Sequence, residues 1–272
     1  LFHGVKENPT THQVNEAFTF AKSHRIDLIV AVGGGSSIDC AKATNFLLTN
    51  GGEMVDYWGT GKAKKPMLPL VAIPTTAGTG SEVQSFALIT DEKTNRKMAC
   101  GDPKAAPAVA LLDPELTITQ PAKVTALTGI DAIAHAIETW VSNRRNPVSQ
   151  LYSREAWRLL SNNILRVLED PFASEARGAM LLGANYAGTA IENSMLGAAH
   201  SCANPLTAHY GVVHGAAVGL MLPAVIRFNT TEVGPLYTQL SLNHKGSEQL
   251  AEYIEGLMES TGLPLRLSGY KI

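Results

Sequence analysis

Four residues that can bind a transition metal stand in two short segments of the sequence. Asp131 and His135 are four residues apart in TGIDAIAHAIE, so on a helix they share one face. His200 and His214 bracket a proline-containing stretch that can fold back on itself. Three imidazoles and one carboxylate suit a divalent transition metal, and the absence of thiolates counts against a zinc-finger-like structural site. Each histidine alone would favour an ordinary core or surface role, but small apolar neighbours favour a site because a buried imidazole needs a partner.

A glycine-rich turn in AVGGGSSIDCAKA can bind phosphate. It follows the apolar run from Leu28 to Val32 and precedes a helical pattern, and this order presents free backbone N–H groups to an anion. Ser36 can add a hydroxyl. The segment is neither the GxGxxG fingerprint nor a Walker loop. Glycine also serves the sterics of many turns, so the segment alone is weak evidence for a nucleotide site.

Four motifs together resemble the iron-containing (group III, metal-dependent) alcohol dehydrogenase family. GGGSSIDCAK, PTTAGTGSE, TGIDAIAHAIE and the block from His200 to His214 occur in the order and spacing of that family. The resemblance extends over nearly the whole chain, from Asn8 to beyond LMLPAVIRFN at 220–229. It implies a dehydroquinate-synthase-like fold, in which an α/β nucleotide-binding domain is followed by an all-α metal-binding domain.

The resemblance also implies where the domains lie. We expect an α/β dinucleotide-binding domain at 1–120 and an all-helical metal and substrate domain at 121–272, with the cofactor in the cleft between them. Compared with the family, the chain looks truncated at both ends, since it opens with LFHGVKENPT, without Met, and stops at LPLRLSGYKI. The N-terminal part that it lacks usually carries the residue that reads the adenosine ribose, so NAD and NADP both stay open.

The implied activity is that of an NAD(P)-dependent, metal-dependent alcohol dehydrogenase. Such an enzyme interconverts an alcohol and an aldehyde or ketone by hydride transfer, with the substrate oxygen on the metal, because a divalent cation lowers the pKa of the alcohol. Four protein ligands already fill a zinc tetrahedron, so the need for an open position favours Fe²⁺, with Zn²⁺ as the alternative. A glycerol or polyol dehydrogenase-like enzyme, a maleylacetate-reductase-like enzyme and a non-catalytic fragment are the other candidates, and the retained Asp131 weighs against the second.

The family pattern assigns two groups of site residues. The predicted metal ligands are Asp131, His135, His200 and His214. The predicted cofactor-binding residues are Gly34, Gly35, Ser36, Asp39, Thr75, Thr79 and Lys97. Each cofactor residue has a structural alternative: the carboxylate suits a helix dipole, the threonines can cap a helix or turn, and the lysine can be an ordinary surface residue.

Two further positions near the predicted metal site need an interpretation. Many relatives carry a second histidine four residues after the third ligand, linked to proton transfer, but here that place holds Asn204. An amide cannot act as a general base at neutral pH, so His209 is the predicted proton relay, with a water relay as an equal alternative. Glu138 lies seven residues after Asp131, and we expect it to support a ligand or cap a helix rather than bind metal.

Composition excludes several other classes of protein. A net charge of -2 gives no reason to expect nucleic acid or an anionic membrane surface as a partner. No apolar run approaches a transmembrane length, and the N-terminus is not a signal peptide. Three cysteines without a CxxC pair suit a reducing cytosol. We therefore expect a cytoplasmic homo-oligomer, a dimer or larger, that acts on a small alcohol or aldehyde.

The elements before about residue 120 predict a mostly parallel sheet. A helix at 11–24, with Thr10 or Thr11 as its N-cap, precedes a buried strand at 28–32 and a helix at about 37–48. Further strands follow at 70–73 and 108–112, and 86–90 pairs with 97–100 as a hairpin. Strands that alternate with helices in this way are typical of a parallel sheet.

The rest of the chain predicts helices only. A short helix at 121–127 is expected to end at Gly129, which separates it from a second helix through Trp140. Long helical patterns follow at about 148–168 and 174–193. Another begins near Gly215 and is expected to kink at Pro223.

Overall fold

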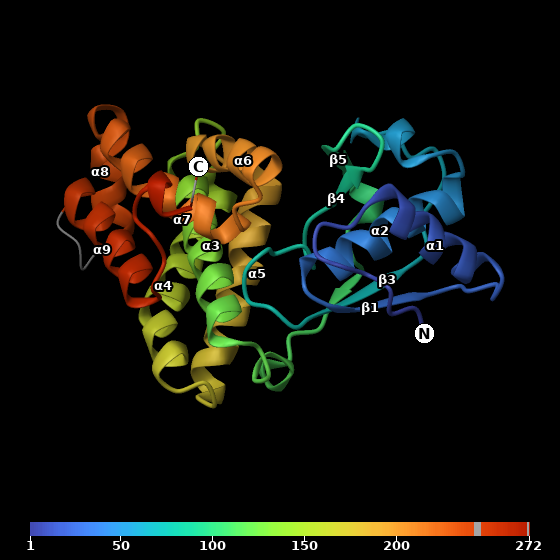
Figure 1. The fold of residues 1–272 in the computed structure, drawn as a ribbon, viewed down its shortest axis with the longest axis horizontal. Helices are drawn as coiled ribbons and strands as arrows, with labels where there is room; N and C mark the ends of the chain where they lie inside the picture. Colours follow the sequence, from blue (N-terminus) through green and yellow to red (C-terminus); the bar gives the residue numbers. More distant parts are fainter. Residues whose placement is uncertain (242–245, 271) are drawn as a thin grey trace. The chain divides into compact units, whose positions relative to one another are not determined.

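A computed structural model describes residues 1–241, 246–270 and 272, and it divides the chain into two compact units (Figure 1). The α/β unit consists of Leu1–Thr76 and Ser81–Leu116, and the helical unit consists of Ala77–Gly80 and Thr117–Ile272. The predicted fold class, an α/β part followed by a helical part, is confirmed. The loop Ala77–Gly80 interrupts the α/β unit and packs with the helices, which the sequence did not indicate.

The α/β unit contains two small sheets and two helices. Its elements in chain order are α1 (Thr11–Lys22), β1 (Ile29–Gly33), α2 (Gly35–Asn50), η1 (Met54–Tyr57), β2 (Gly59–Thr60), β3 (Leu70–Pro74), β4 (Phe86–Asp91), β5 (Arg96–Gly101), η2 (Pro103–Ala105) and β6 (Val109–Ala110). The predicted cap of α1 is confirmed, because the Thr10 hydroxyl accepts the Gln13 amide and the Gln13 side chain accepts the Thr10 amide.

One sheet is parallel and the other is mixed. β3 lies between β1 and β6 with both pairs parallel, and Gly33 is opposite Pro74 at the carboxyl end of the β1–β3 pair. The predicted hairpin of β4 and β5 is confirmed, and β5 also pairs in parallel with β2. The strand predicted at 108–112 is shorter than expected, since only Val109–Ala110 pairs.

β1 is less buried than its uniformly apolar sequence predicts. Ala31 faces the core, but Val30 is 55% exposed and Val32 is 54% exposed. One face of this strand is therefore open among the described residues. An apolar run cannot tell whether one or both faces of a strand are covered, which is why the prediction of a buried strand is wrong for these positions.

The helices of the helical unit follow the 3-10 turn η3 (Pro114–Thr117), within which the chain passes from one unit to the other. Its elements are α3 (Ala122–Val141), α4 (Pro147–Glu169), α5 (Ser174–Ser194), α6 (Ala198–Tyr210), α7 (His214–Phe228), α8 (Thr230–Leu240), α9 (Ser247–Ser260) and η4 (Leu267–Tyr270). α3 packs against α4, α5 and α7, and α7 also packs against α6 and α9 (Figure 1). None of the helices in the described ranges is long and apolar enough to cross a membrane.

α3 is one continuous helix, so the predicted break at Gly129 is wrong. A Cβ at Gly129 would lie 2.9 Å from Ile164 of α4 and 3.1 Å from Met180 of α5. The glycine therefore allows α4 and α5 to approach α3 closely, and this packing outweighs its low helix propensity. The continuity matters for the site, because α3 carries Asp131 at its middle and His135 one turn later.

Candidate metal centre and cofactor loop

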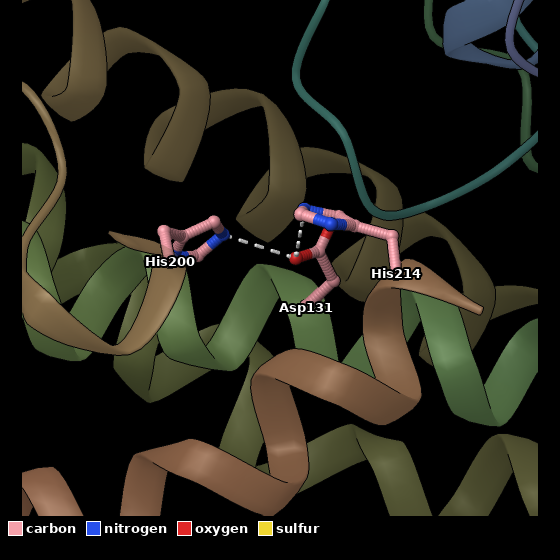
Figure 2. A group of neighbouring side chains, drawn as sticks. All are labelled: Asp131, His200 and His214. Atoms are coloured by element: carbon pink, nitrogen blue, oxygen red, sulfur yellow. Dashed lines mark hydrogen bonds and ion pairs between the residues drawn. The ribbon is translucent and has the colours of Figure 1, made fainter. Parts of the chain in front are cut away.

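Three helices of the helical unit bring the predicted metal ligands together. Asp131 and His135 lie one turn apart on α3, His200 lies in the first turn of α6, and His214 is the first residue of α7. Figure 2 shows the imidazoles of His200 and His214 turned toward the Asp131 carboxylate. The local sequence thus places two helix N-termini against one face of α3.

Two glycines allow α6 and α7 to begin so close to α3. A Cβ at Gly215, the second residue of α7, would lie 2.2 Å from the backbone oxygen of Leu127. A Cβ at Gly197, the N-cap of α6, would lie 2.9 Å from the Glu138 carboxylate. Larger side chains at either position would push a histidine-bearing helix away from α3.

The three imidazoles surround a single carboxylate oxygen. The Nε2 atoms of His200, His135 and His214 lie 3.3, 3.5 and 3.7 Å from Oδ1 of Asp131. One ligand atom from each of Asp131, His200 and His214 fits within a span of 4.8 Å. His135 is not part of that tighter triad, but its ring stacks on that of His200 with centroids 4.8 Å apart.

This donor set fits a divalent transition metal. In a tetrahedral centre with bonds of about 2.1 Å, neighbouring ligand atoms lie about 3.4 Å apart. The distances of 3.3 to 3.7 Å from the Asp131 oxygen to the imidazole nitrogens match that spacing. One oxygen cannot accept good hydrogen bonds from three nitrogens at these distances, whereas a shared cation would satisfy all of them.

The electrostatics of the cluster favour an ionised carboxylate. Burial alone would raise the pKa of Asp131, but the surrounding imidazoles outweigh burial and hold it well below its usual range. Burial lowers the pKa of His135 to about 4, and the pull of the carboxylate does not offset it. Burial also acts to lower the pKa of His200, but its two carboxylate partners, Asp131 and Glu138, raise it to about 9.

Glu138 contacts the cluster from behind. Its Oε2 is hydrogen-bonded to Nδ1 of His200, and its Oε1 accepts the backbone amide of Ala199 at 2.7 Å. The side chain thus both caps α6 and contacts a predicted ligand, which confirms the role predicted from its position in the sequence. Its position three residues after His135 on α3 was the only sequence signal for this contact.

The glycine-rich turn lies at the carboxyl end of β1. Gly34 is the N-cap of α2, which begins at Gly35, two residues earlier than predicted. Because first-turn N–H groups have no acceptor within a helix, the amides of Gly35 and Ser36 can bind an anion. The Thr75 amide donates to the Gly33 oxygen at 3.0 Å. Four predicted cofactor residues therefore meet at one edge of the parallel sheet: Gly34, Gly35, Ser36 and Thr75.

Lys97 joins the same edge through a residue that sequence reasoning missed. Asn8 donates its backbone amide to the Ser36 hydroxyl at 3.3 Å, and its side-chain oxygen accepts Nζ of Lys97 at 3.3 Å. Asn8 has a φ of 53°, a left-handed conformation that asparagine tolerates well. The Asn-Pro pair at residues 8 and 9 was the available sequence signal for such a turn.

The other predicted cofactor residues lie elsewhere. Asp39 is buried in α2, where Oδ1 accepts the Ser81 hydroxyl and Oδ2 accepts the Leu88 amide at 3.0 Å, so both oxygens have protein partners. Thr79 lies in the loop that packs with the helical unit. The structure thus gives Asp39 a role in the interior of the α/β unit.

His209 does not join the metal cluster. It lies in the last turn of α6 and is exposed, whereas His200 lies in the first turn and is buried. Nine residues of helix separate them, which corresponds to about 13 Å along the axis. Its role as a proton relay stays a prediction, and Asn204 is exposed in the middle of the same helix.

Comparison with known proteins supports the same interpretation. Residues 1–114 match a family model described as iron-containing alcohol dehydrogenase, and residues 125–272 match the C-terminal model of the Fe-containing alcohol dehydrogenase family. Alcohol dehydrogenase 4 of Schizosaccharomyces pombe is 39% identical over 232 residues, which are 85% of this chain and 55% of that protein. The NAD-dependent methanol dehydrogenase of Bacillus methanolicus is 37% identical over 257 residues, which are 94% of this chain and 66% of that protein.

A solved structure has the same fold. The crystal structure of a 1,3-propanediol oxidoreductase superposes with a TM-score of 0.93 at 32% sequence identity, and the match covers all of this chain and 74% of that one. The chain therefore spans between about half and three quarters of the lengths of these relatives.

Proposed function

Because this chain belongs to the iron-containing alcohol dehydrogenase family, we propose that it serves as an NAD-dependent, metal-dependent dehydrogenase that interconverts a small alcohol and its aldehyde or ketone. The observation that carries the proposal is the convergence of three imidazole nitrogens on one oxygen of Asp131. Neither an ordinary buried ion pair nor a structural core needs three histidines at that spacing.

In this proposal the metal ligands are Asp131, His135, His200 and His214. The bound cation, Fe²⁺ or alternatively Zn²⁺, would act as a Lewis acid that stabilises negative charge on the substrate oxygen. The chain contributes one full negative charge through Asp131, whose carboxyl stays ionised. Burial keeps His135 neutral near pH 7, which leaves a lone pair available for ligation.

The small residues of α3 keep water away from the ligands. Ala132, Ala134 and Ala136 are fully buried around the two α3 ligands, and both of those ligands are at most 5% exposed. Such surroundings strengthen the attraction between the carboxylate and a cation, because little water screens it. His214, whose side chain is 31% exposed, is the most open of the four and marks the side from which a substrate can enter.

The proposed cofactor loop is the N-terminus of α2. The free amides of Gly35 and Ser36 would bind the pyrophosphate, and the positive end of the helix dipole favours its charge. Lys97, held by Asn8 beside the Ser36 hydroxyl, would add a positive charge to the same edge. The NAD-dependent methanol dehydrogenase of Bacillus methanolicus supports NAD over NADP, and this relative and the 1,3-propanediol oxidoreductase favour small alcohols as substrates.

Metal content and turnover of the purified protein test the proposal together. We expect about one bound metal per chain and nicotinamide reduction with a primary alcohol from a panel of increasing length, faster with NAD⁺ than with NADP⁺. Asp131→Asn should lose both metal and turnover. Asp27→Asn, which removes the same charge at an exposed site, is the matched control and should keep both. A metal-free protein that oxidises alcohols, or full turnover in the Asp131 variant, would contradict the proposal.

A further inference from the structure

We propose that Glu138 is a positioning residue of the metal centre, which fixes the tautomer and orientation of the His200 imidazole. The inference rests on the proposed function, because it assumes that His200 binds the metal. It goes further in assigning a task to a residue that would not itself touch the metal or the substrate.

The contacts of Glu138 determine which nitrogen of His200 carries hydrogen. The carboxylate lies against Nδ1 of His200, and its side chain is only 3% exposed. An ionised carboxylate only accepts hydrogen bonds, so Nδ1 must be the protonated nitrogen. In the neutral ring, Nε2, which lies 3.3 Å from Oδ1 of Asp131, then carries the lone pair and faces the cluster. Only this tautomer can bind a metal through Nε2, the nitrogen that faces the cluster.

The same carboxylate sets the position of the ring. Its second oxygen accepts the Ala199 amide at 2.7 Å, which attaches the first turn of α6 to α3. The backbone next to His200 and the far side of its ring are therefore held by one side chain. Gly197 makes this possible, because a Cβ there would lie 2.9 Å from the carboxylate.

Of the two buried ligand histidines on α3 and α6, only His200 has a carboxylate against its Nδ1 among the described residues. His135 has a buried Nδ1 with no hydrogen-bond partner among the described residues, and its ring is held by stacking on His200 instead. A displacement of the His200 ring would therefore also displace the His135 ring. Loss of Glu138 should thus weaken metal binding through two ligands at once.

The space around Glu138 makes the substitution informative. The residue borders a cavity of about 360 Å³ in the helical unit, which Tyr237 and Asn229 also line. A shorter or neutral side chain therefore leaves room for water rather than a collapsed core. In Glu138→Gln, the amide oxygen can take only one of the two positions that the carboxylate oxygens hold, so the NH₂ group must face the Ala199 amide or Nδ1 of His200. Facing His200, it would favour the tautomer whose Nε2 is protonated and cannot bind the metal.

Metal affinity measured by chelator competition tests the inference without relying on activity. We expect Glu138→Gln to bind Zn²⁺ or Co²⁺ roughly 10- to 100-fold more weakly than the unaltered chain. In the Zn²⁺-loaded protein, the Nδ1 proton of His200 should be visible by NMR and protected from exchange, and this signal should be lost in the variant. Gly197→Ala, which displaces the carboxylate without changing its charge, should weaken metal binding in the same direction.

Thr139→Ala is the matched control. Thr139 is the next residue on α3, is fully buried, and its hydroxyl bonds to Ser153 and to the carbonyl oxygens of His135 and Ala136. Because it contacts only the backbone of His135 and no imidazole, its loss should lower stability without changing metal affinity. Equal losses of affinity in the Thr139 and Glu138 variants would reduce Glu138 to a structural role and overturn the inference. A Glu138→Gln protein with metal affinity within twofold of the unaltered chain would overturn it as well. If the unaltered chain itself bound no metal, the proposed function would fail together with this inference.

Discussion

Replacing Lys42 with methionine should destabilise the α/β unit more than any surface substitution. Lys42 is fully buried in α2, where its Nζ donates to the Ser81 oxygen at 2.6 Å, to the Ser81 hydroxyl at 2.9 Å and to the Phe86 oxygen at 2.8 Å. The same nitrogen lies 3.8 Å from Oδ1 of Asp39. The lysine thus ties α2 to the chain that leads into β4.

The expected cost follows from the groups that lose their partner. Methionine has a similar length but no donor, so the Ser81 and Phe86 carbonyl oxygens would each lose a hydrogen bond from a charged donor, at about 1.5–3 kcal/mol each. Asp39 would also lose the buried cation that lies 3.8 Å from its Oδ1. Removing one partner of a buried ion pair typically costs about 3–5 kcal/mol, and we expect a loss of unfolding free energy in that range.

Urea unfolding of the variants measures this loss. Hydrogen exchange of the Leu88 amide, which donates to Asp39, reports on the α/β unit itself. Asp39→Asn combined with Lys42→Met should be less destabilised than the sum of the single variants by at least about 1 kcal/mol, because the two residues share one network. Lys64→Met, at an exposed position, is the control and should stay within about 0.5 kcal/mol. A loss below about 1 kcal/mol for Lys42→Met, or strict additivity, would refute the reasoning.

Four further outcomes can be checked. His200→Ala and His214→Ala should each abolish metal binding while the α/β unit stays folded, as judged by elemental analysis and hydrogen exchange. Gly35→Val should raise the dissociation constant for NAD far more than that for metal, both measured by calorimetry, because the α2 amides must approach the phosphate closely. If His209 relays protons, His209→Gln should keep metal but remove one limb of the pH–rate profile, and an unchanged profile would favour a water relay. Burial alone would raise the pKa of Asp102, but a lysine and two backbone amides outweigh it and hold that pKa below the usual range. The stability that Asp102 contributes is therefore present above about pH 4 and lost as pH falls through its folded pKa. Asp102→Asn should thus destabilise the protein in urea more at pH 7 than at pH 2.

Local patterns predicted the elements whose signals lie within one segment. The N-cap of α1 and the hairpin of β4 and β5 are confirmed, because capping and alternation act over a few residues. α2 begins earlier than predicted, since Gly35 and Ser36 have no apolar side chain to mark the helix. The predicted break at Gly129 is wrong, because α4 and α5 pack closely on α3 at this glycine. These contacts come from residues distant in sequence, so a local pattern could not predict that the helix continues.

The candidate site also has features that the local sequence predicts and features that depend on tertiary packing. The spacing of Asp131 and His135 on one helix face could be predicted from the sequence alone. That His200 and His214 approach the same oxygen depends on tertiary packing, and only the family resemblance indicated it. Nothing in the sequence marked Lys42 as buried, because a lysine in a helix is usually a solvated surface residue.

The loop Ala77–Gly80 has a consequence for how this protein can be divided. The chain passes from the α/β unit to the helical unit at Thr76, returns after Gly80 and crosses again after Leu116. Gly80 has a φ of 65°, and a Cβ there would lie 2.6 Å from the Gly188 backbone in α5. The helical unit is therefore not a contiguous module that recombination at residue 116 could transfer. A chimera joined there would place one parent's loop against the other parent's α5, so the two halves are expected to evolve as a matched pair.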